Sequence, residues 1–243
     1  MRMLAFSGRT AKEILRDPLT LGFGLGFPLV VLLLLSAIQA NIPVSLFEIQ
    51  HLTPGITVFG LAFMTLFSAT LIAKDRESAF LQRLYTTPLT ALDFILGYAL
   101  PVLPIAAAQC VICYIAAIIL GLPVTATILL AVLFILPVSL LFIGLGLLCG
   151  SVFNVKQVGG ICGALLTNLT AWLSGVWFDL DLVGGVFKKA AYALPFVHAV
   201  ELERAVLNGD FAGFVPHLLW VLGYAAVILA AAVLLFLRQM KRQ

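Results

Sequence analysis

Residues 54–88 have the sequence PGITVFGLAFMTLFSATLIA followed by KDRESAFLQRLYTTP, and this stretch decides the fold. The first part, Pro54–Ala73, holds no charged side chain, whereas Lys74–Glu77 are all charged. A bilayer core of ~30 Å is crossed by a helix of ~20 apolar residues. We therefore predict a transmembrane helix over Pro54–Ala73, capped by Thr53 with Pro54 at its first position.

Apolar runs of this kind recur along the whole chain. The 243 residues are 63% hydrophobic and 10% charged, far from the composition of a water-soluble domain. We expect one all-α, polytopic membrane domain over residues 1–243 with six transmembrane helices. Their predicted bounds are Leu19–Ala40, Pro54–Ala73, Phe94–Leu120, Val124–Phe153, Val158–Phe178 and Val215–Leu237.

Basic residues predict the orientation of these helices. Eleven of the 14 Lys and Arg residues fall on the side that would hold both termini, and only Lys188, Lys189 and Arg204 fall on the other. Because basic residues accumulate in cytoplasmic segments, both termini are expected in the cytoplasm. Five or seven crossings are the alternatives, and either would place one basic terminus outside.

Three segments outside the runs have patterns of their own. Residues 1–16 favour an amphipathic helix lying in the membrane interface, although Thr10 and Glu13 could form a capping box that breaks it. Residues 74–90 form the cytoplasmic loop after the second run, and Thr90 with Asp93 resembles a capping box. Residues 179–214 are predicted to form an external re-entrant segment of two helices, Leu182–Leu194 and Val197–Leu207, broken at Pro195.

Several classes of function are disfavoured by what the chain lacks. The six predicted spans hold no Asp, Glu, Lys or Arg, as an ion-coupled transporter would need. The phosphate-binding pattern G-x-x-x-x-G-K-[ST] is absent, so ATP would have to be hydrolysed by a separate protein. Cys110 and Cys113 form a C-x-x-C pattern without nearby His or acidic residues, which favours packing over metal binding. We expect no catalytic residue, no metal site and no nucleic-acid partner.

The charged stretch after Ala73 has two interpretations. On a helix over Arg76–Tyr85, the side chains of Phe80, Leu81, Leu84 and Tyr85 share one face, and Pro88 ends it. Such a helix could be the docking surface for a partner protein. It could equally be an ordinary basic anchor beside a transmembrane helix.

The same stretch resembles the signature of type-2 ABC-transporter permeases, which are bacterial membrane subunits related to antibiotic-resistance exporters. Lys74–Glu77 correspond to its charged cluster, Leu81 and Leu84 to its leucines, and Thr87-Pro88 to its end. Ile95-Leu96-Gly97-Tyr98 resembles the I-L-G-K-like stretch that follows, with Tyr98 in place of the basic residue. Further matches are Leu173–Phe178, Ala193–Phe196 and Val200–Arg204, with Asp179 in place of a proline.

The resemblance implies a membrane subunit of an ATP-driven exporter in the inner membrane. Two such subunits, identical or related, would pair with two cytoplasmic ABC ATPases that hold ATP and Mg²⁺, among membrane lipids. The substrate would be amphiphilic: a drug, lipid, glycolipid or peptide. A non-transporting membrane partner or receptor for an ATPase is the alternative.

The resemblance and the sequence pattern together give expected roles for individual residues. Coupling to the ATPase is expected from Asp75, Arg76, Glu77, Phe80, Leu81, Arg83, Leu84 and Tyr85. Glu77 is expected to pair with Arg9, Lys12 or Arg16. The predicted substrate path is Phe59, Phe63, Phe67, Asn168 and Trp172, and the predicted external gate is Phe178, Pro195, Glu201 and Arg204. The pairs Gly22/Gly26, Gly146/Gly150 and Gly159/Gly163 fit close helix packing.

Overall fold

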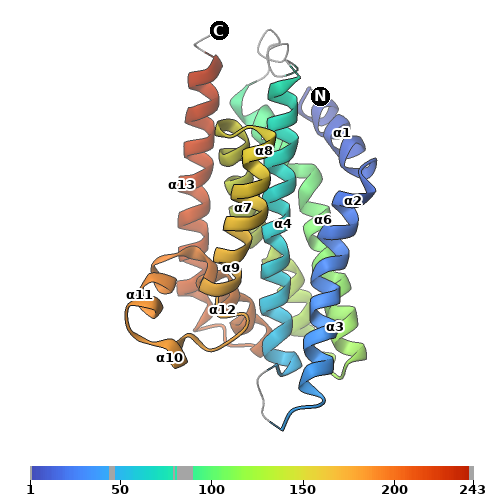
Figure 1. The fold of residues 1–243 in the computed structure, drawn as a ribbon, viewed down its shortest axis with the longest axis vertical. Helices are drawn as coiled ribbons and strands as arrows, with labels where there is room; N and C mark the ends of the chain where they lie inside the picture. Colours follow the sequence, from blue (N-terminus) through green and yellow to red (C-terminus); the bar gives the residue numbers. More distant parts are fainter. Residues whose placement is uncertain (1, 44–46, 79, 81–89, 241–243) are drawn as a thin grey trace.

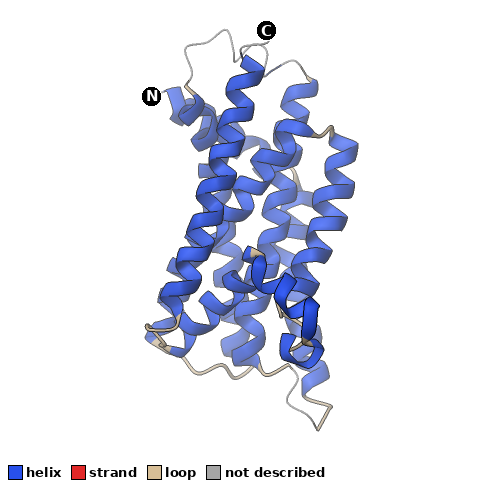
Figure 2. Cartoon of the chain, turned by 90° about the vertical axis from the view of Figure 1, so that its left-hand side faces the viewer, coloured by secondary structure: helices blue, strands red, loops and turns tan. Residues whose placement is uncertain are grey.

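The computed structural model describes residues 2–43, 47–78, 80 and 90–240, and within these ranges it is helical with no strand. Five helices in this part are long and apolar enough to cross a membrane: Pro18–Gln39, Ile49–Glu77, Ala91–Ile119, Ala126–Val152 and Phe214–Arg238. They run side by side in one bundle (Figures 1 and 2). The prediction of an all-α polytopic membrane protein is therefore confirmed at this level.

The first helix, α1 (Arg2–Leu15), lies against the side of the bundle (Figure 1). α1 is one continuous helix, so the capping box that would break it at Thr10 does not form. Instead, the Thr10 hydroxyl donates to the Phe6 carbonyl inside the helix, 3.1 Å away. Phe6, Thr10 and Ile14 form its buried face, while Leu4 and Leu15 are exposed.

The first long helical run has three parts: α2 (Pro18–Leu21), the π-helical segment η1 (Gly22–Gly26) and α3 (Phe27–Gln39). Asp17 caps its start by accepting from the Thr20 amide at 3.1 Å. Little of this run is buried within the subunit, in contrast to the second long helix.

That second helix, α4 (Ile49–Glu77), is the central element of the bundle, with 83% of its most apolar stretch buried. It is longer than predicted at both ends. Pro54 lies inside it rather than at its first position, so the predicted start at Thr53 and Pro54 is wrong. Hydrogen bonding continues past Ala73, so Lys74–Glu77 form its last turn rather than the start of a separate helix.

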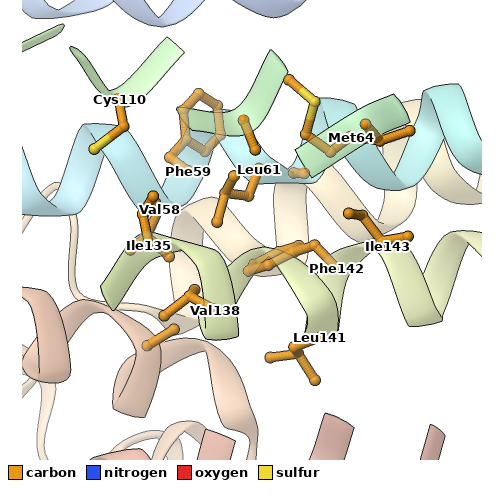
Figure 3. Close-up of a cluster of buried hydrophobic side chains, with 14 of the residues drawn as sticks. Val58, Phe59, Leu61, Met64, Cys110, Ile135, Val138, Leu141, Phe142 and Ile143 are labelled. Carbon is orange, nitrogen blue, oxygen red and sulfur yellow. The ribbon is translucent and has the colours of Figure 1, made fainter. Parts of the chain in front are cut away.

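The next two long helices pack against α4. α6 (Ala91–Ile119) begins at the predicted capping box, in which Thr90 and Asp93 each accept from the other's backbone amide. α7 (Ala126–Val152) lies along α4, and Figure 3 shows Leu61 of α4 and Phe142 of α7 between the two helices. The core of the bundle lies between these helices.

The fifth predicted span, Val158–Phe178, is an interrupted helix. It consists of α8 (Val155–Val158), the π-helical segment η2 (Gly159–Leu166) and α9 (Thr167–Leu173). It is absent from the five membrane-length helices of the described residues, so a sixth crossing remains a prediction. π-Helical turns are rare and often occur at functional sites.

The last third of the chain forms a short helical cluster and then a long helix. The cluster contains α10 (Leu180–Val183), α11 (Gly185–Ala193) and α12 (Pro195–Asn208), separated by Gly184 with φ 62° and by Leu194. The single predicted helix Leu182–Leu194 is therefore wrong, whereas the break before Pro195 and the end at Asn208 agree. α13 (Phe214–Met240) then returns along the bundle.

The two ends of the bundle differ. Figure 1 places the start of α1, the end of α4 and the end of α13 at one end, which we call the termini end. α10, α11 and α12 lie at the opposite end (Figure 1). Each end holds one group of the predicted functional residues.

Candidate functional site

A buried ion pair at the termini end joins α1 to the last turn of α4. Asp75 is 2% exposed, and its two carboxylate oxygens accept from the two terminal nitrogens of Arg9 at 2.5 and 2.6 Å. Tyr98 of α6 donates its hydroxyl to the same carboxylate at 2.6 Å. Hydrogen bonding to Asp75 raises the pKa of Arg9. This cluster ties three helices together around one acidic side chain.

Aromatic packing supports the ion pair. Phe6 of α1 meets the edge of the Tyr98 ring with centroids 4.9 Å apart. A Cβ atom at Gly97 would lie 2.0 Å from the Phe6 ring, so only glycine leaves room there. The Arg9 guanidinium also lies 4.1 Å from the centre of the Phe80 ring, within cation–π range. Gly97-Tyr98 in the I-L-G-K-like stretch is therefore the surface that receives α1.

The two residues after Asp75 hold the turn between α7 and α8. Arg76 donates to the carbonyls of Ser151 and Phe153, the latter at 2.6 Å, at the C-terminal end of α7. Glu77 accepts from the Val155 amide at 2.9 Å, at the N-terminal end of α8. The positive charge of Arg76 thus lies at the C-terminal end of α7 and the negative charge of Glu77 at the N-terminal end of α8, where the helix dipoles stabilise them.

The predicted pairing of Glu77 with α1 is therefore wrong. Asp75 pairs with Arg9 instead. The side chains of Asp75 and Glu77 point to different sides of α4, so Asp75 contacts α1 and Glu77 contacts α8. Lys12 and Arg16 line a shallow pocket on α1 together with Arg9. Of the predicted coupling residues, Leu81, Arg83, Leu84 and Tyr85 lie outside the described residues. Sequence reasoning missed Tyr98 and Phe6, although the Gly97-Tyr98 match was a signal for both.

An aromatic groove of about 400 Å³ runs along the bundle between α4, α9 and the first long run. Phe59 and Phe63 from α4 face Asn168 and Trp172 from α9 across it, so the groove unites four of the five predicted path residues. Phe67 is the exception, because it packs on Gly24, where a Cβ would lie 2.4 Å from its ring. The rest of the lining is formed by residues that were not predicted to be part of the path: Phe23, Phe27, Gly163, Thr167, Ala171 and Trp177.

Geometry in the groove is set by ring contacts. Phe27 lies 5.3 Å from Phe63, and Phe59 lies 5.3 Å from Trp177, centroid to centroid. Asn168 donates its amide to the Ala164 carbonyl at 2.8 Å. The groove is therefore mostly apolar, with Thr167 and Asn168 as the polar residues of its wall.

A second cavity, of about 570 Å³, lies at the end opposite the termini. Three of the predicted gate residues line it: Phe178, Glu201 and Arg204. The Arg204 guanidinium donates to Glu201 at 2.9 Å, to the Gly175 carbonyl at 2.9 Å and to the His51 carbonyl at 3.3 Å. It therefore fastens α12 to the start of α4 and to the turn after α9. Pro195 is buried at the first position of α12 and does not line the cavity.

A histidine pair joins α12 to α13 beside this cavity. His198 Nε2 lies 3.0 Å from the Tyr192 carbonyl, which can only accept, so this nitrogen carries the hydrogen. His198 Nδ1 lies 2.9 Å from His217 Nδ1. When both rings are neutral, His217 must therefore donate. The Trp220 ring stacks on His198 with centroids 4.8 Å apart.

This pair should make the contact between α12 and α13 sensitive to acid. Burial lowers the pKa of His198 below its ordinary value of 6.5. A lowered pKa means that the neutral ring is favoured in the folded state, so the contact is at full strength above pH ~6.5 and weakens below it. We expect Trp220 fluorescence to change on acidification below that value, and the change to be absent in His198→Gln.

His51→Gln is the matched control, because His51 lies at the same end outside the pair and should leave the transition in place. An unchanged transition in His198→Gln would assign the signal to another group. Glu201 and His217 are the other titratable groups that act on His198, whereas Tyr192 acts through its backbone carbonyl.

The fold and these sites define a class of protein. A bundle of membrane-length helices has a charged, interlocked cluster at one end, a lateral aromatic groove, and a cavity beneath short helices at the other end. This arrangement is that of a multi-pass membrane protein built around one central helix.

A family model described as ABC-2 type transporter matches residues 2–208, so the chain belongs to the ABC-2 type transporter family. It is therefore a membrane permease subunit of an ABC transporter, not its catalytic subunit. A comparison with curated proteins found no match to the chain.

Proposed function

We propose that this permease exports an amphiphilic substrate, a drug, lipid, glycolipid or peptide, using ATP hydrolysed by a separate ABC ATPase. The supporting observation is the placement of α4. Its last turn holds α1, α7 and α8 through Asp75, Arg76 and Glu77, and the same helix supplies Phe59 and Phe63 to the aromatic groove. Force applied at the termini end therefore reaches the groove through one buried helix.

The assembly proposed with this function has four chains. Two copies of the ATPase, which hold ATP and Mg²⁺, dock at the termini end in the cytoplasm. A second membrane subunit, identical or related, covers the groove. Residues 74–90 receive the ATPase, and Arg9 of α1 lies beside Asp75 at the start of this range. The chain resides in a bacterial inner membrane with both termini in the cytoplasm, as the distribution of basic residues favours.

In this proposal the groove holds the apolar body of the substrate and the opposite cavity is its exit. Aromatic rings offer large, rigid apolar contact surfaces, and such contacts contribute ~0.5–1.5 kcal/mol beyond area burial. Arg204 closes the exit by fastening α12 to the start of α4 and to the turn after α9, and Phe178 lines the same cavity. ATP-driven movement of α4 would loosen these contacts.

The test is export by the reconstituted complex of this chain and its ATPase. We expect Phe63→Ala and Trp172→Ala each to raise the KM for an amphiphilic substrate by about tenfold, as the loss of ~1.4 kcal/mol requires. Basal ATP hydrolysis should stay unchanged, because neither residue contacts the termini end.

Leu129→Ala is the matched control, since Leu129 is 75% exposed on α7 and lies outside the groove. An equal rise in KM in Leu129→Ala would contradict the role of the groove as the substrate path. The alternative function, a non-transporting membrane partner of an ATPase, predicts that the ATPase copurifies but that no substrate stimulates hydrolysis or is exported.

A further inference from the structure

One fully buried acidic side chain has no part in the proposed force transfer. Glu203 on α12 is 0% exposed, and neither carboxylate oxygen has a hydrogen-bond partner in the described part of the chain. The neighbouring Arg204 is committed elsewhere, to Glu201 and to the carbonyls of His51 and Gly175. Glu203 is thus a carboxyl group in the core without a compensating cation.

A second buried polar group faces the same region. Tyr114 of α6 is 1% exposed, and its hydroxyl also lacks a hydrogen-bond partner among the described residues. Glu203 acts electrostatically on Tyr114 and on Cys110, which lies one turn earlier on α6. The two unpartnered groups, one on α12 and the other on α6, therefore lie within electrostatic range of each other.

Physical chemistry decides the protonation of Glu203 in this position. Leaving an ionised carboxylate unpaired in a protein core costs several kcal/mol, so the group takes up a proton instead. Burial accordingly raises the pKa of Glu203 well above its ordinary value, and no charged side chain adds to that shift. The neutral acid has an O–H donor that a tyrosine hydroxyl can accept.

We propose that Glu203 is a proton-binding site of this permease, occupied while α12 is packed in the bundle and emptied when movement of α12 brings water to the carboxyl group. The first half stands on burial and the missing cation. The second half rests on the proposed export function, since it needs α12 to move during the cycle. No residue predicted from the sequence had this role, because the Glu201-Leu202-Glu203-Arg204 stretch was assigned to the external segment.

The direction of the pH effect follows from the protonation of Glu203 in the two arrangements of α12. The packed arrangement holds the proton and the hydrated one releases it, so rising external pH favours the hydrated arrangement of α12. Because one proton is released, the equilibrium changes by at most tenfold per pH unit. Of the groups that face Glu203, Tyr114 and Cys110 keep their protons at neutral pH by their ordinary chemistry. Glu201 and Arg204 on the same helix are paired with each other.

Infrared spectroscopy of the purified chain in lipid nanodiscs tests proton binding directly. At neutral pH we expect a carboxylic-acid C=O band that is lost in Glu203→Gln and retained in Glu201→Gln. Glu201 is the matched control, a part-exposed acid two residues away. Glutamine keeps the shape of the neutral acid, so the variant should fold. Absence of the band in the wild-type chain, or its persistence in Glu203→Gln, overturns the proposal.

Export by the reconstituted complex at varied external pH tests the release step. Wild-type export should rise with external pH, and Glu203→Gln should lack this rise because glutamine cannot ionise. An identical pH profile in the two proteins overturns proton release during the cycle. If the complex exports nothing, the proposed function fails, while the infrared result still decides whether Glu203 binds a proton.

Discussion

Arg9→Ala should release α1 from the bundle at the termini end. The substitution leaves Asp75, which is 2% exposed, without the bidentate partner that it has at 2.5 and 2.6 Å. Losing one member of a fully buried pair costs ~3–5 kcal/mol, and an exposed pair is worth ~0–1 kcal/mol. The Arg9 side chain is 37% exposed, so we expect a cost between these limits, about 2–3 kcal/mol.

Hydrogen exchange of the α1 amides measures this release, because the exchange rate reports the free energy of local opening. Arg16→Ala, at an exposed position directly after the end of α1, is the control and should leave exchange unchanged. Arg9→Lys should fall between the two, since an ammonium group cannot form the two parallel hydrogen bonds. Removing both charges in Arg9→Ala with Asp75→Asn should recover most of the loss. Equal exchange in Arg9→Ala and Arg16→Ala would show that the pair does not hold α1.

If α1 takes part in coupling, the same variant has a functional consequence. We expect Arg9→Ala to hydrolyse ATP in the reconstituted complex without substrate stimulation. Asp75 connects α1 to α4, whereas Arg76 and Glu77 connect α4 to α7 and α8. Breaking the first connection should therefore leave the second in place.

Local sequence signals predicted local structure well. The Thr90–Asp93 capping box, the helix end at Asn208-Gly209 and the long apolar helices depend on residues close together in the sequence. The position of the charges after Ala73 was not predicted correctly. The predicted helix ended with the apolar run, whereas the real helix ends where its backbone hydrogen bonds stop. α4 continues for four residues past Ala73, and this rotates Asp75 and Glu77 toward different neighbours.

The aromatic groove shows the same limit at tertiary level. Phe59, Phe63 and Phe67 repeat every four residues, so they share one face of α4. The sequence does not show which neighbour covers each of them. Gly24 of η1 admits Phe67 and buries it, while Phe59 and Phe63 remain in the groove beside Phe27. Phe67 therefore differs from Phe59 and Phe63 only because another helical segment packs against it.

Gly150→Ala and Gly146→Ala should each destabilise the bundle at its tightest helix crossing. A Cβ atom at Gly150 would lie 2.6 Å from the Ala69 carbonyl oxygen, and one at Gly146 would lie 2.6 Å from the Thr65 carbonyl oxygen. Both obstacles are backbone atoms of α4, which cannot rotate away as a side chain would. Forcing extra atoms into a packed core costs ~1–3 kcal/mol, and the contact between α4 and α7 is the core of this bundle.

Glycines that have open space around them give the opposite expectation, which makes the test specific. Gly223 of α13 has no atom within 4 Å of an added Cβ, and the same is true of Gly22 and Gly159 from the predicted packing pairs. Alanine in a helix interior is favoured over glycine by ~0.5–1 kcal/mol, so Gly223→Ala should be neutral or stabilising. Thermal unfolding of the purified variants in detergent measures both signs. If Gly150→Ala and Gly223→Ala had equal thermal stability, α4 and α7 would be able to move apart and admit the added methyl group. The two helices would then not form the rigid pair that the proposed transfer of force from the termini end requires.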